Sequence, residues 1–389
     1  MTLNPSRWIP LLCLLCAGWG SVSAQTPEAP SLAKDLSEEI HRIEVTVKDM
    51  YNRTETRKIT LTVFKPPGEG PFPLVILNHG RAASPEKRAQ PLRFRFEPQA
   101  RYLVGKGLTV IVPTRVGYGE AFGNFDPETN GSCALSQIEP MSVAASDQVI
   151  AAHDFAKNLK YVDTSRWWVM GQSVGGLTAV ATVWRNPPGL QGGINFSGGT
   201  GGDPVTRPEQ SCGVNAIARL WKNKAKDAQV DMLWLYWEND LFWGRQAPRE
   251  WHQAWVEGGG RAQFHQLPSV GKDGHAGFTS DMDHWVPWVD AYFEKFGVAQ
   301  AELPPVPEAS GFADVTDLSK VPISAEAIQK IYTRFLGSPL PRAFAIGPKG
   351  AVGFAYGDWA IGRALGFCQA RLGAPCKLYA VDQHVVWRN

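Results

Sequence analysis

Two segments near the start of the chain alternate apolar and polar residues, which is the pattern of strands with one buried face. Ile43, Val45 and Val47 form the apolar side of the first segment, and the second lies at 59–63. The polar stretch 49–57 between them predicts an antiparallel pair. Later runs are short and mostly apolar, which is typical of strands buried on both faces of a parallel sheet. These runs lie at 73–78, 108–113, 167–170, 193–196, 232–237 and 262–267.

Apolar residues at helical spacing follow several of these runs. They predict helices over 141–160, 175–185 and 284–296. Strands that alternate with helices after an opening hairpin indicate an α/β fold, with a mostly parallel sheet, helices on both faces and an N-terminal antiparallel hairpin. In such sheets the reacting groups gather at the carboxyl ends of the strands.

A proline-rich stretch divides the chain. Residues 301–312 are predicted to be a linker, and 25–300 to form the α/β domain before it. Residues 313–389 predict a small ββαβ (α+β) module, with strands at 343–346, 352–356 and 376–381 and a helix at 359–372. A module of this size has a thin core, which a disulfide would supplement.

The charges of the chain almost balance. Its 389 residues include 39 Lys and Arg against 37 Asp and Glu, a net charge of +2 without a long basic run, and this excludes a typical nucleic-acid-binding surface. A hydrophobic content of 44% argues against disorder. The metal-binding spacing H-E-x-x-H is absent from the sequence, and C-x-x-C occurs only at 13–16, within an apolar N-terminal run, so neither a metal site nor a cofactor is expected.

The first 24 residues predict a cleaved signal peptide. Arg7 precedes an apolar run at 8–17, which is far shorter than the roughly 20 residues that span a bilayer. The small residues at 22–24 match a signal-peptidase site and place Gln25 at the mature start. The alternative is a buried N-terminal helix, which Pro10 disfavours. A secreted or periplasmic protein without a stable membrane anchor is therefore expected.

Cleavage would leave four cysteines, an even number that indicates disulfides in an oxidising compartment. Cys368 and Cys376 are neighbours in sequence, so we expect one bridge between them and a second between Cys133 and Cys212. Buried free thiols are the alternative.

The sequence Gly-Gln-Ser-Val-Gly-Gly occupies positions 171–176, between an expected strand and an expected helix. This context indicates a nucleophile elbow, a tight turn that projects the hydroxyl of Ser173 beyond the sheet. The small neighbours are needed because the strand and the helix pass close together. The start of the helix adds positive potential where negative charge develops.

Residues after an earlier buried strand complete the expected site. The oxyanion-hole donors are predicted to be the backbone amides of Arg81 and Val174. His79 either contacts substrate or braces this loop. Arg115 and Tyr118, at the end of the strand at 108–113, either contact substrate or support their loop.

The acid and the base should follow Ser173 in that order. Asp240 ends a strong strand 67 residues later and is the expected acid, with Glu238 as the alternative. His275, 35 residues further on in a glycine-rich loop, is the expected base. Nearby aromatic residues, among them Trp237, either bind an apolar group of the substrate or belong to the core. This cluster comprises Trp234, Trp237, Phe242 and Trp243.

Residues about 40 to 298 resemble an α/β-hydrolase of the dienelactone-hydrolase-like group. The resemblance is carried by the runs at 77–80, 113–119, 171–176, 237–240 and 273–275. The dienelactone hydrolases themselves use a cysteine nucleophile, whereas this chain has Ser173. The resemblance therefore implies a general ester hydrolase rather than one specific for dienelactone. The tail at 343–387 resembles small modules at the ends of bacterial secreted proteins, a similarity carried by the run at 376–382. Such a module could bind cell-wall material or a partner protein, or cap the enzyme.

The expected function is hydrolysis of small-molecule carboxylic esters through an acyl-enzyme. A serine peptidase of the prolyl-oligopeptidase-like type is an alternative, because the elbow sequence also resembles that of those enzymes. Against it, the chain has neither a propeller-sized N-terminal domain nor an acidic pair placed to hold a peptide amine. A third alternative is a non-catalytic binding protein with a relic triad.

Overall fold

The computed structural model describes residues 1, 32–33, 36–133, 136–298, 306–357, 359–372 and 376–388. The predicted signal peptide, residues 1–24, lies outside the described residues apart from Met1, and so does part of the predicted linker. Ser31–Asn389 forms one unit by its internal contacts. The domain boundaries at 300 and 313 stay predictions.

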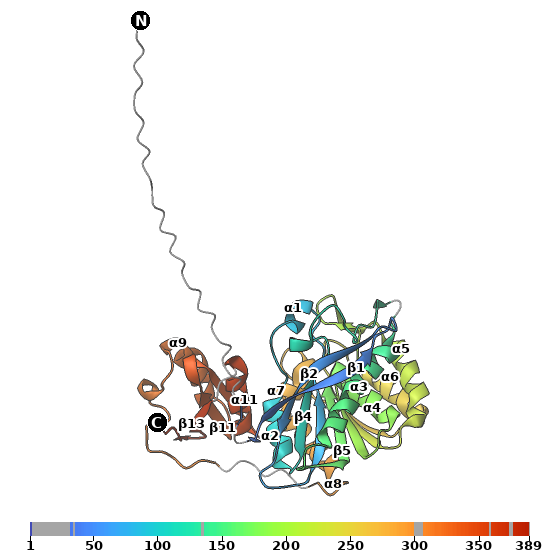
Figure 1. The fold of residues 1–389 in the computed structure, drawn as a ribbon. Coiled ribbons are helices and arrows are strands. Elements are labelled where there is room, and N and C mark those ends of the chain that lie inside the picture. Colours follow the sequence, from blue (N-terminus) through green and yellow to red (C-terminus); the bar gives the residue numbers. More distant parts are fainter. Residues whose placement is uncertain are drawn as a thin grey trace. The chain divides into compact units, whose positions relative to one another are not determined.

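An eight-stranded sheet forms the centre of the larger region (Figure 1). Its strand order is β1-β2-β4-β3-β5-β6-β9-β10. Strand β2 is antiparallel to both of its neighbours, and every other neighbouring pair is parallel. The strands are β1 (Glu39–Lys48), β2 (Thr54–Phe64), β3 (Phe72–Asn78), β4 (Thr109–Thr114), β5 (Val162–Gln172), β6 (Leu190–Phe196), β9 (Asp231–Trp237) and β10 (Ala262–Leu267). The predicted α/β class, mostly parallel sheet and N-terminal hairpin are confirmed.

Both faces of this sheet are covered by helices, because successive side chains of a strand point to opposite faces. In β3, Leu74 and Ile76 join one hydrophobic cluster with α3 to α6, while Val75 and Leu77 join another with α2, α7 and α8. The helices are α1 (Pro85–Arg88), α2 (Glu97–Gly105), α3 (Ile138–Ala156), α4 (Val174–Arg185), α5 (Val214–Lys224), α6 (Gln246–Glu257), α7 (Gly277–Ser280) and α8 (Met282–Glu294). Short 3-10 turns are η2 (Gly119–Ala121), η4 (Ala225–Asp227) and η5 (Gly274–Ala276).

The hairpin of β7 (Gly202–Asp203) and β8 (Arg207–Ser211) was not predicted from the sequence. Its residues are half-buried or exposed, so they carry no alternation of apolar and polar side chains. Strand β2 also begins at Thr54, before the predicted end of the polar loop, because its first residues pair with β1 at an exposed edge. Hydrogen bonding to a neighbouring strand therefore creates strand structure at residues that have no alternation of apolar and polar side chains.

The C-terminal region has its own antiparallel sheet, in the order β12-β11-β13-β14. Helix α11 packs on this sheet, and the disulfide Cys368–Cys376 joins α11 to the residue before β13, as predicted. A helical segment before the sheet and the short strand β14 were not predicted. The elements are η6 (Leu318–Lys320), α9 (Ala325–Ala327), a π-helical turn η7 (Ile328–Tyr332), α10 (Thr333–Leu336), β11 (Arg342–Ile346), η8 (Pro348–Gly350), β12 (Val352–Tyr356), α11 (Ala360–Leu372), β13 (Lys377–Val381) and β14 (His384–Val385). Within the described residues, none of the helices is both long and apolar enough to cross a bilayer.

Candidate active site

Ser173 lies on the turn between β5 and α4, at the carboxyl end of a central strand. Its backbone is left-handed, with φ 58° and ψ −123°, a conformation that non-glycine residues adopt only under constraint. The constraint comes from crowding, because a Cβ atom on Gly175 would overlap the carbonyl group of Asn78 in β3. The sequence Gly-x-Ser-x-Gly thus encodes a strained turn that aims the serine away from the sheet.

Main-chain hydrogen bonds hold this turn in place. The amide of Ser173 donates to the carbonyl of Phe196 at 2.9 Å, and the amide of Gly199 donates to the carbonyl of Ser173 at 3.3 Å. The serine is 7% exposed, and Val174 is the first residue of α4. The unpaired amides and the dipole at the start of this helix favour negative charge.

Asp240 and His275 form a buried pair from two separate loops. His275 Nδ1 donates to Asp240, 3.1 Å from Oδ1 and 3.0 Å from Oδ2. Asp240 Oδ1 also accepts from the amides of Phe242, at 2.8 Å, and Trp243, at 3.2 Å, so its carboxylate is fixed by its own loop. With the proton on Nδ1, the Nε2 atom of His275 is free to accept one.

The loop of His275 is tied to the turn of Ser173. Gln172 Nε2 donates to the carbonyl of His275 at 2.9 Å. Asp273 Oδ1 accepts from the amide of His275 at 2.9 Å and caps the short turn η5. Neither Gln172 nor Asp273 was predicted, although Asp two residues before His275 is a typical capping signal.

Glu238, the alternative acid, pairs instead with Arg245, with 2.6 Å between Glu238 Oε2 and Arg245 Nη2. The structure brings Asp240, and not Glu238, to the histidine. This structure combines the observed strand order with a serine turn after β5, the carboxylate of Asp240 after β9 and His275 after β10. The fold is that of the α/β-hydrolases.

The loop after β3 lies against the serine. A Cβ atom on Gly80 would be 3.0 Å from Ser173 Cβ, so the backbone around residue 80 is next to the Ser173 side chain. His79 holds this loop: its Nδ1 donates to the carbonyl of Gly80 at 2.7 Å, and its Nε2 accepts from the amide of Arg115 at 3.1 Å. Burial and the nearby Arg115 guanidinium lower the pKa of His79 well below its usual range, so it is neutral. His79 also stacks on Phe94, with 3.7 Å between ring centroids.

The expected substrate-binding side chains of His79, Arg115, Tyr118 and Trp237 are no more than 1% exposed. The Arg115 guanidinium is paired with the carboxylate of Glu128, and Trp237 Nε1 donates to Asp281 at 2.6 Å. These burials and contacts support the second role considered for each residue, which is support of a loop for His79, Arg115 and Tyr118 and a place in the core for Trp237. They lie at strand ends, as expected, but their side chains point into the protein.

Of the other aromatic residues considered for substrate binding, two are buried in the core and one lines a cavity. Trp234 and Trp243 are at most 2% exposed and belong to the core. Phe242 stacks on the ring of His275, with 3.9 Å between centroids, and lines a cavity of about 630 Å³. Phe242 is thus the aromatic residue in contact with both His275 and open space.

This cavity is bordered by the loop after β3, the residues at 130–133 and 136, the β7–β8 hairpin and Phe242. Its lining includes Arg81, Lys87, Arg207 and the disulfide Cys133–Cys212. Arg81 is held by Asp126, with 3.0 Å between Nη1 and Oδ1. Although burial alone would lower the pKa of Arg81, its hydrogen bond to the Asp126 carboxylate raises it.

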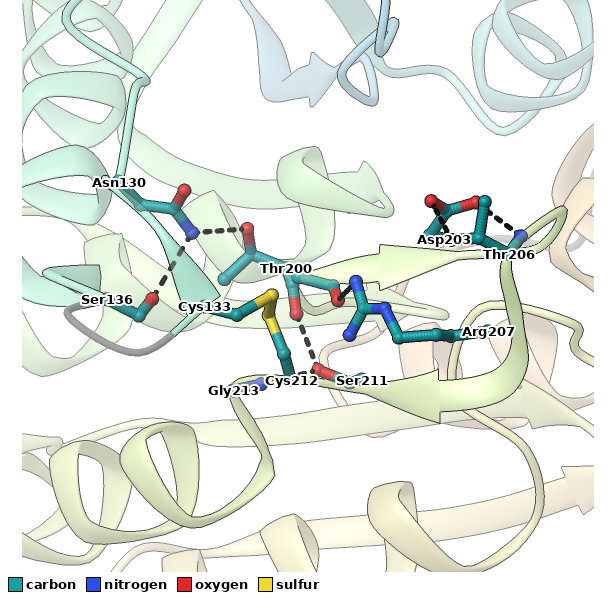
Figure 2. Close-up of a disulfide and its surroundings, with 11 residues drawn as sticks. Asn130, Cys133, Ser136, Thr200, Asp203, Thr206, Arg207, Ser211, Cys212 and Gly213 are labelled. Atoms are coloured by element: carbon teal, nitrogen blue, oxygen red, sulfur yellow. Dashed lines mark hydrogen bonds between the residues drawn. A yellow bond between two sulfur atoms is a disulfide. The ribbon is translucent and has the colours of Figure 1, made fainter.

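Figure 2 shows the disulfide Cys133–Cys212 and the hydrogen bonds around it. Thr200, before the hairpin, accepts at Oγ1 from Asn130 Nδ2 at 3.0 Å, and at its carbonyl from Ser211 Oγ at 2.7 Å. The disulfide predicted between Cys133 and Cys212 then joins the same two segments covalently across 79 residues of chain. The hairpin is therefore anchored at the side facing the cavity.

Within the described residues, no group of three or more His, Cys, Asp or Glu side chains is arranged to hold a metal ion. The arrangement of Ser173, Asp240 and His275 can instead perform nucleophilic chemistry with side chains alone.

No protein-family model matches this sequence, and no curated protein matches it either. Similar solved structures include an acylaminoacyl peptidase of Pyrococcus horikoshii, at 13% identity and a TM-score of 0.45, which covers 70% of this chain and 43% of the peptidase. They also include an esterase of Pyrococcus furiosus, at 14% identity and a TM-score of 0.45, which covers 68% of this chain and 93% of the esterase. The dipeptidyl peptidase 4 of Porphyromonas gingivalis matches at 16% identity and a TM-score of 0.44, over 66% of this chain and 35% of its own. The chain thus spans less than half the length of either peptidase.

Proposed function

We propose that the protein is a serine hydrolase that cleaves carboxylic esters through an acyl-enzyme. The observation that carries this proposal is the strained turn of Ser173 beside the buried pair of Asp240 and His275. A non-glycine residue in a left-handed turn costs about 1–3 kcal/mol, and such strain is typical of functional sites.

In the proposed first step, Ser173 Oγ attacks the ester carbonyl carbon while His275 Nε2 takes the hydroxyl proton. The negative charge that develops on the carbonyl oxygen is bound by the amides of Arg81 and Val174. The carbon–oxygen bond to the alcohol then breaks, and His275 returns the proton to the departing alcohol. Asp240 keeps the histidine ring in orientation and stabilises its positive form.

In the second step, water attacks the acyl carbon and gives a proton to His275. The bond to Ser173 Oγ breaks, the serine recovers its proton, and the carboxylic acid leaves. The cavity of about 630 Å³ bordered by Phe242 has a size typical of sites for small molecules and is the proposed substrate pocket.

The lining of this pocket favours the ester over the peptidase hypothesis. An enzyme that takes peptides by their free amine needs an available carboxylate. The carboxyl group of Asp203 in the lining accepts instead from the amides of Val205 and Thr206, both at 3.0 Å, within its own turn. Arg81, Lys87 and Arg207 would repel an amine.

We expect a fluorophosphonate probe to label the wild-type protein and to leave Ser173→Ala unlabelled, because the serine oxygen forms the covalent bond. Ser165→Ala, which changes an exposed serine of β5, is the matched control and should label like wild type. Wild type should hydrolyse p-nitrophenyl esters and not peptide anilides. Labelling that does not depend on Ser173 would contradict the proposed nucleophile, and turnover of anilides without esters would favour the peptidase.

We expect the double variant Cys133→Ser/Cys212→Ser to raise KM for the ester about tenfold and to lose about 2–4 kcal/mol of unfolding free energy. The reason is that the hairpin on the pocket wall loses its covalent anchor. Steady-state kinetics at a temperature where circular dichroism shows the folded state measures the first effect, and denaturant titration the second. Cys368→Ser/Cys376→Ser, which removes the other disulfide, should keep KM within twofold. Equal KM changes in both double variants would refute a specific role for the pocket wall.

We also propose that the protein acts in the periplasm or outside the cell. Two disulfides support this proposal, because such bonds persist in oxidising compartments. N-terminal sequencing of the protein from its natural source tests it, with Gln25 as the expected first residue.

A further inference from the structure

Arg363 of α11 connects the C-terminal region to the segment that follows His275. Its Nη1 lies 3.1 Å from Asp283 Oδ2, and its Nη2 donates to the carbonyl of Ser280 at 3.3 Å. Nη1 also donates to the carbonyl of Tyr356 at 3.1 Å, within the C-terminal region. The arginine is 9% exposed, so these contacts are shielded from water.

Ser280 and His275 belong to one short run of backbone. His275 lies in η5, which is followed directly by α7, and Ser280 is the last residue of α7. The hydroxyl of Ser280 donates back to the carbonyl of Ala276 at 3.0 Å. A shift at Ser280 is therefore transmitted to the histidine over five residues.

Helix α11 also packs closely on α2. A Cβ atom on Gly366 would overlap the ring of Pro98, and one on Gly362 would be 3.0 Å from Arg101 Cδ. Trp359 contacts Tyr102 edge to face, with 5.2 Å between ring centroids. The close approach of the two helices requires glycine at position 366, whereas at position 362 the flexible Arg101 side chain could move aside.

Helix α2 is in turn joined to both loops of the proposed active site. Gln99 Nε2 donates to the carbonyl of Phe278 in α7 at 3.1 Å, and Phe96 meets the Phe278 ring at 5.4 Å. Phe94, just before α2, stacks on His79 of the oxyanion loop. The C-terminal region thus contacts the segment after His275 directly, through Arg363, and indirectly, through α2.

We propose that the C-terminal region holds the loop of His275 in its working position, with Arg363 as the positioning residue. This rests on the proposed function, in which His275 is the base. Arg363 touches neither the reacting atoms nor the cavity. Its loss should therefore lower kcat and leave KM almost unchanged, since misplacing a catalytic group by about 1 Å can reduce the rate by up to about 100-fold.

The experiment compares four variants of the full chain with wild type. Arg363→Met removes the charge but keeps much of the length, and Arg363→Lys restores one charged contact to Asp283. Gly366→Ala improves helix propensity by about 1 kcal/mol but places a methyl group against Pro98, so it disturbs docking without weakening α11 itself. Gly337→Ala is the matched control, because its Cβ atom would meet only ordinary contacts at 3.6 and 3.7 Å.

Ester hydrolysis is measured per active site titrated with fluorophosphonate, at a temperature where circular dichroism shows every variant folded. We expect Arg363→Met and Gly366→Ala to lower kcat about tenfold with KM within twofold, Arg363→Lys to recover part of the rate, and Gly337→Ala to match wild type. Wild-type kcat in both Arg363→Met and Gly366→Ala would overturn the inference and leave the proposed function standing. A loss of titratable sites with normal kcat per site would show a merely structural role and overturn it too. Absence of Ser173 labelling in wild type would overturn both proposals.

Discussion

Replacing Asp240 by asparagine is expected to lower kcat for ester hydrolysis by about 10⁴-fold, with little change in KM. The carboxylate accepts from His275 Nδ1 and from two backbone amides of its own loop. An amide in its place can present its NH₂ group to the histidine, which moves the imidazole proton to Nε2. The nitrogen that must accept the serine proton is then already protonated, and the attack is lost. Steady-state kinetics and the rate of fluorophosphonate labelling both measure this effect.

Glu238→Gln is the matched control for this variant, because Glu238 follows the same strand and pairs with Arg245. Its kcat should stay within about twofold of wild type, since exposed ion pairs contribute little. A large loss of activity in Glu238→Gln with a small loss in Asp240→Asn would reverse the assignment of the acid.

Replacing Arg115 by methionine is expected to reduce the free energy of unfolding by about 3 kcal/mol. Arg115 and Glu128 are at most 1% exposed and form an ion pair, and removing one partner of a buried pair typically costs 3–5 kcal/mol. We expect the lower end of this energy range because Arg81 Nη1, 4.0 Å from Glu128 Oε2, would partly balance the negative charge left on Glu128. Denaturant titration followed by circular dichroism measures the loss.

Two further variants show whether the effect comes from the buried charge. Adding Glu128→Gln to Arg115→Met should recover part of the stability, because the unpaired charge is then absent. Arg42→Met breaks an exposed pair with Glu120, whose side chains are 55% and 58% exposed, and should cost less than about 1 kcal/mol. If Arg115→Met instead kept its stability and raised KM, Arg115 would contact substrate after all.

Much of this protein could be predicted from sequence because the relevant physics is local. The alternation around Val45 and the apolar run that became β3 follow from which faces of a strand are buried. The elbow at Ser173 follows from steric limits within a few residues, since only glycine fits at position 175 against Asn78. The disulfide Cys368–Cys376 could be predicted because its two cysteines are only 8 residues apart in the sequence.

The tertiary structure alone decided where side chains at the strand ends point. Glu238 and Asp240 both follow β9, and only their partners separate their roles, since Glu238 pairs with the nearby Arg245 whereas Asp240 meets His275 from a loop 35 residues later. Arg115 faces inward because Glu128 is there to pair with it. The need for glycine at position 366 arises only from the contact of α11 with Pro98 of α2, which the sequence does not reveal. Local patterns therefore determined the strands, the elbow and the order of the reacting residues, whereas contacts between distant segments decided which neighbouring side chain reaches the site.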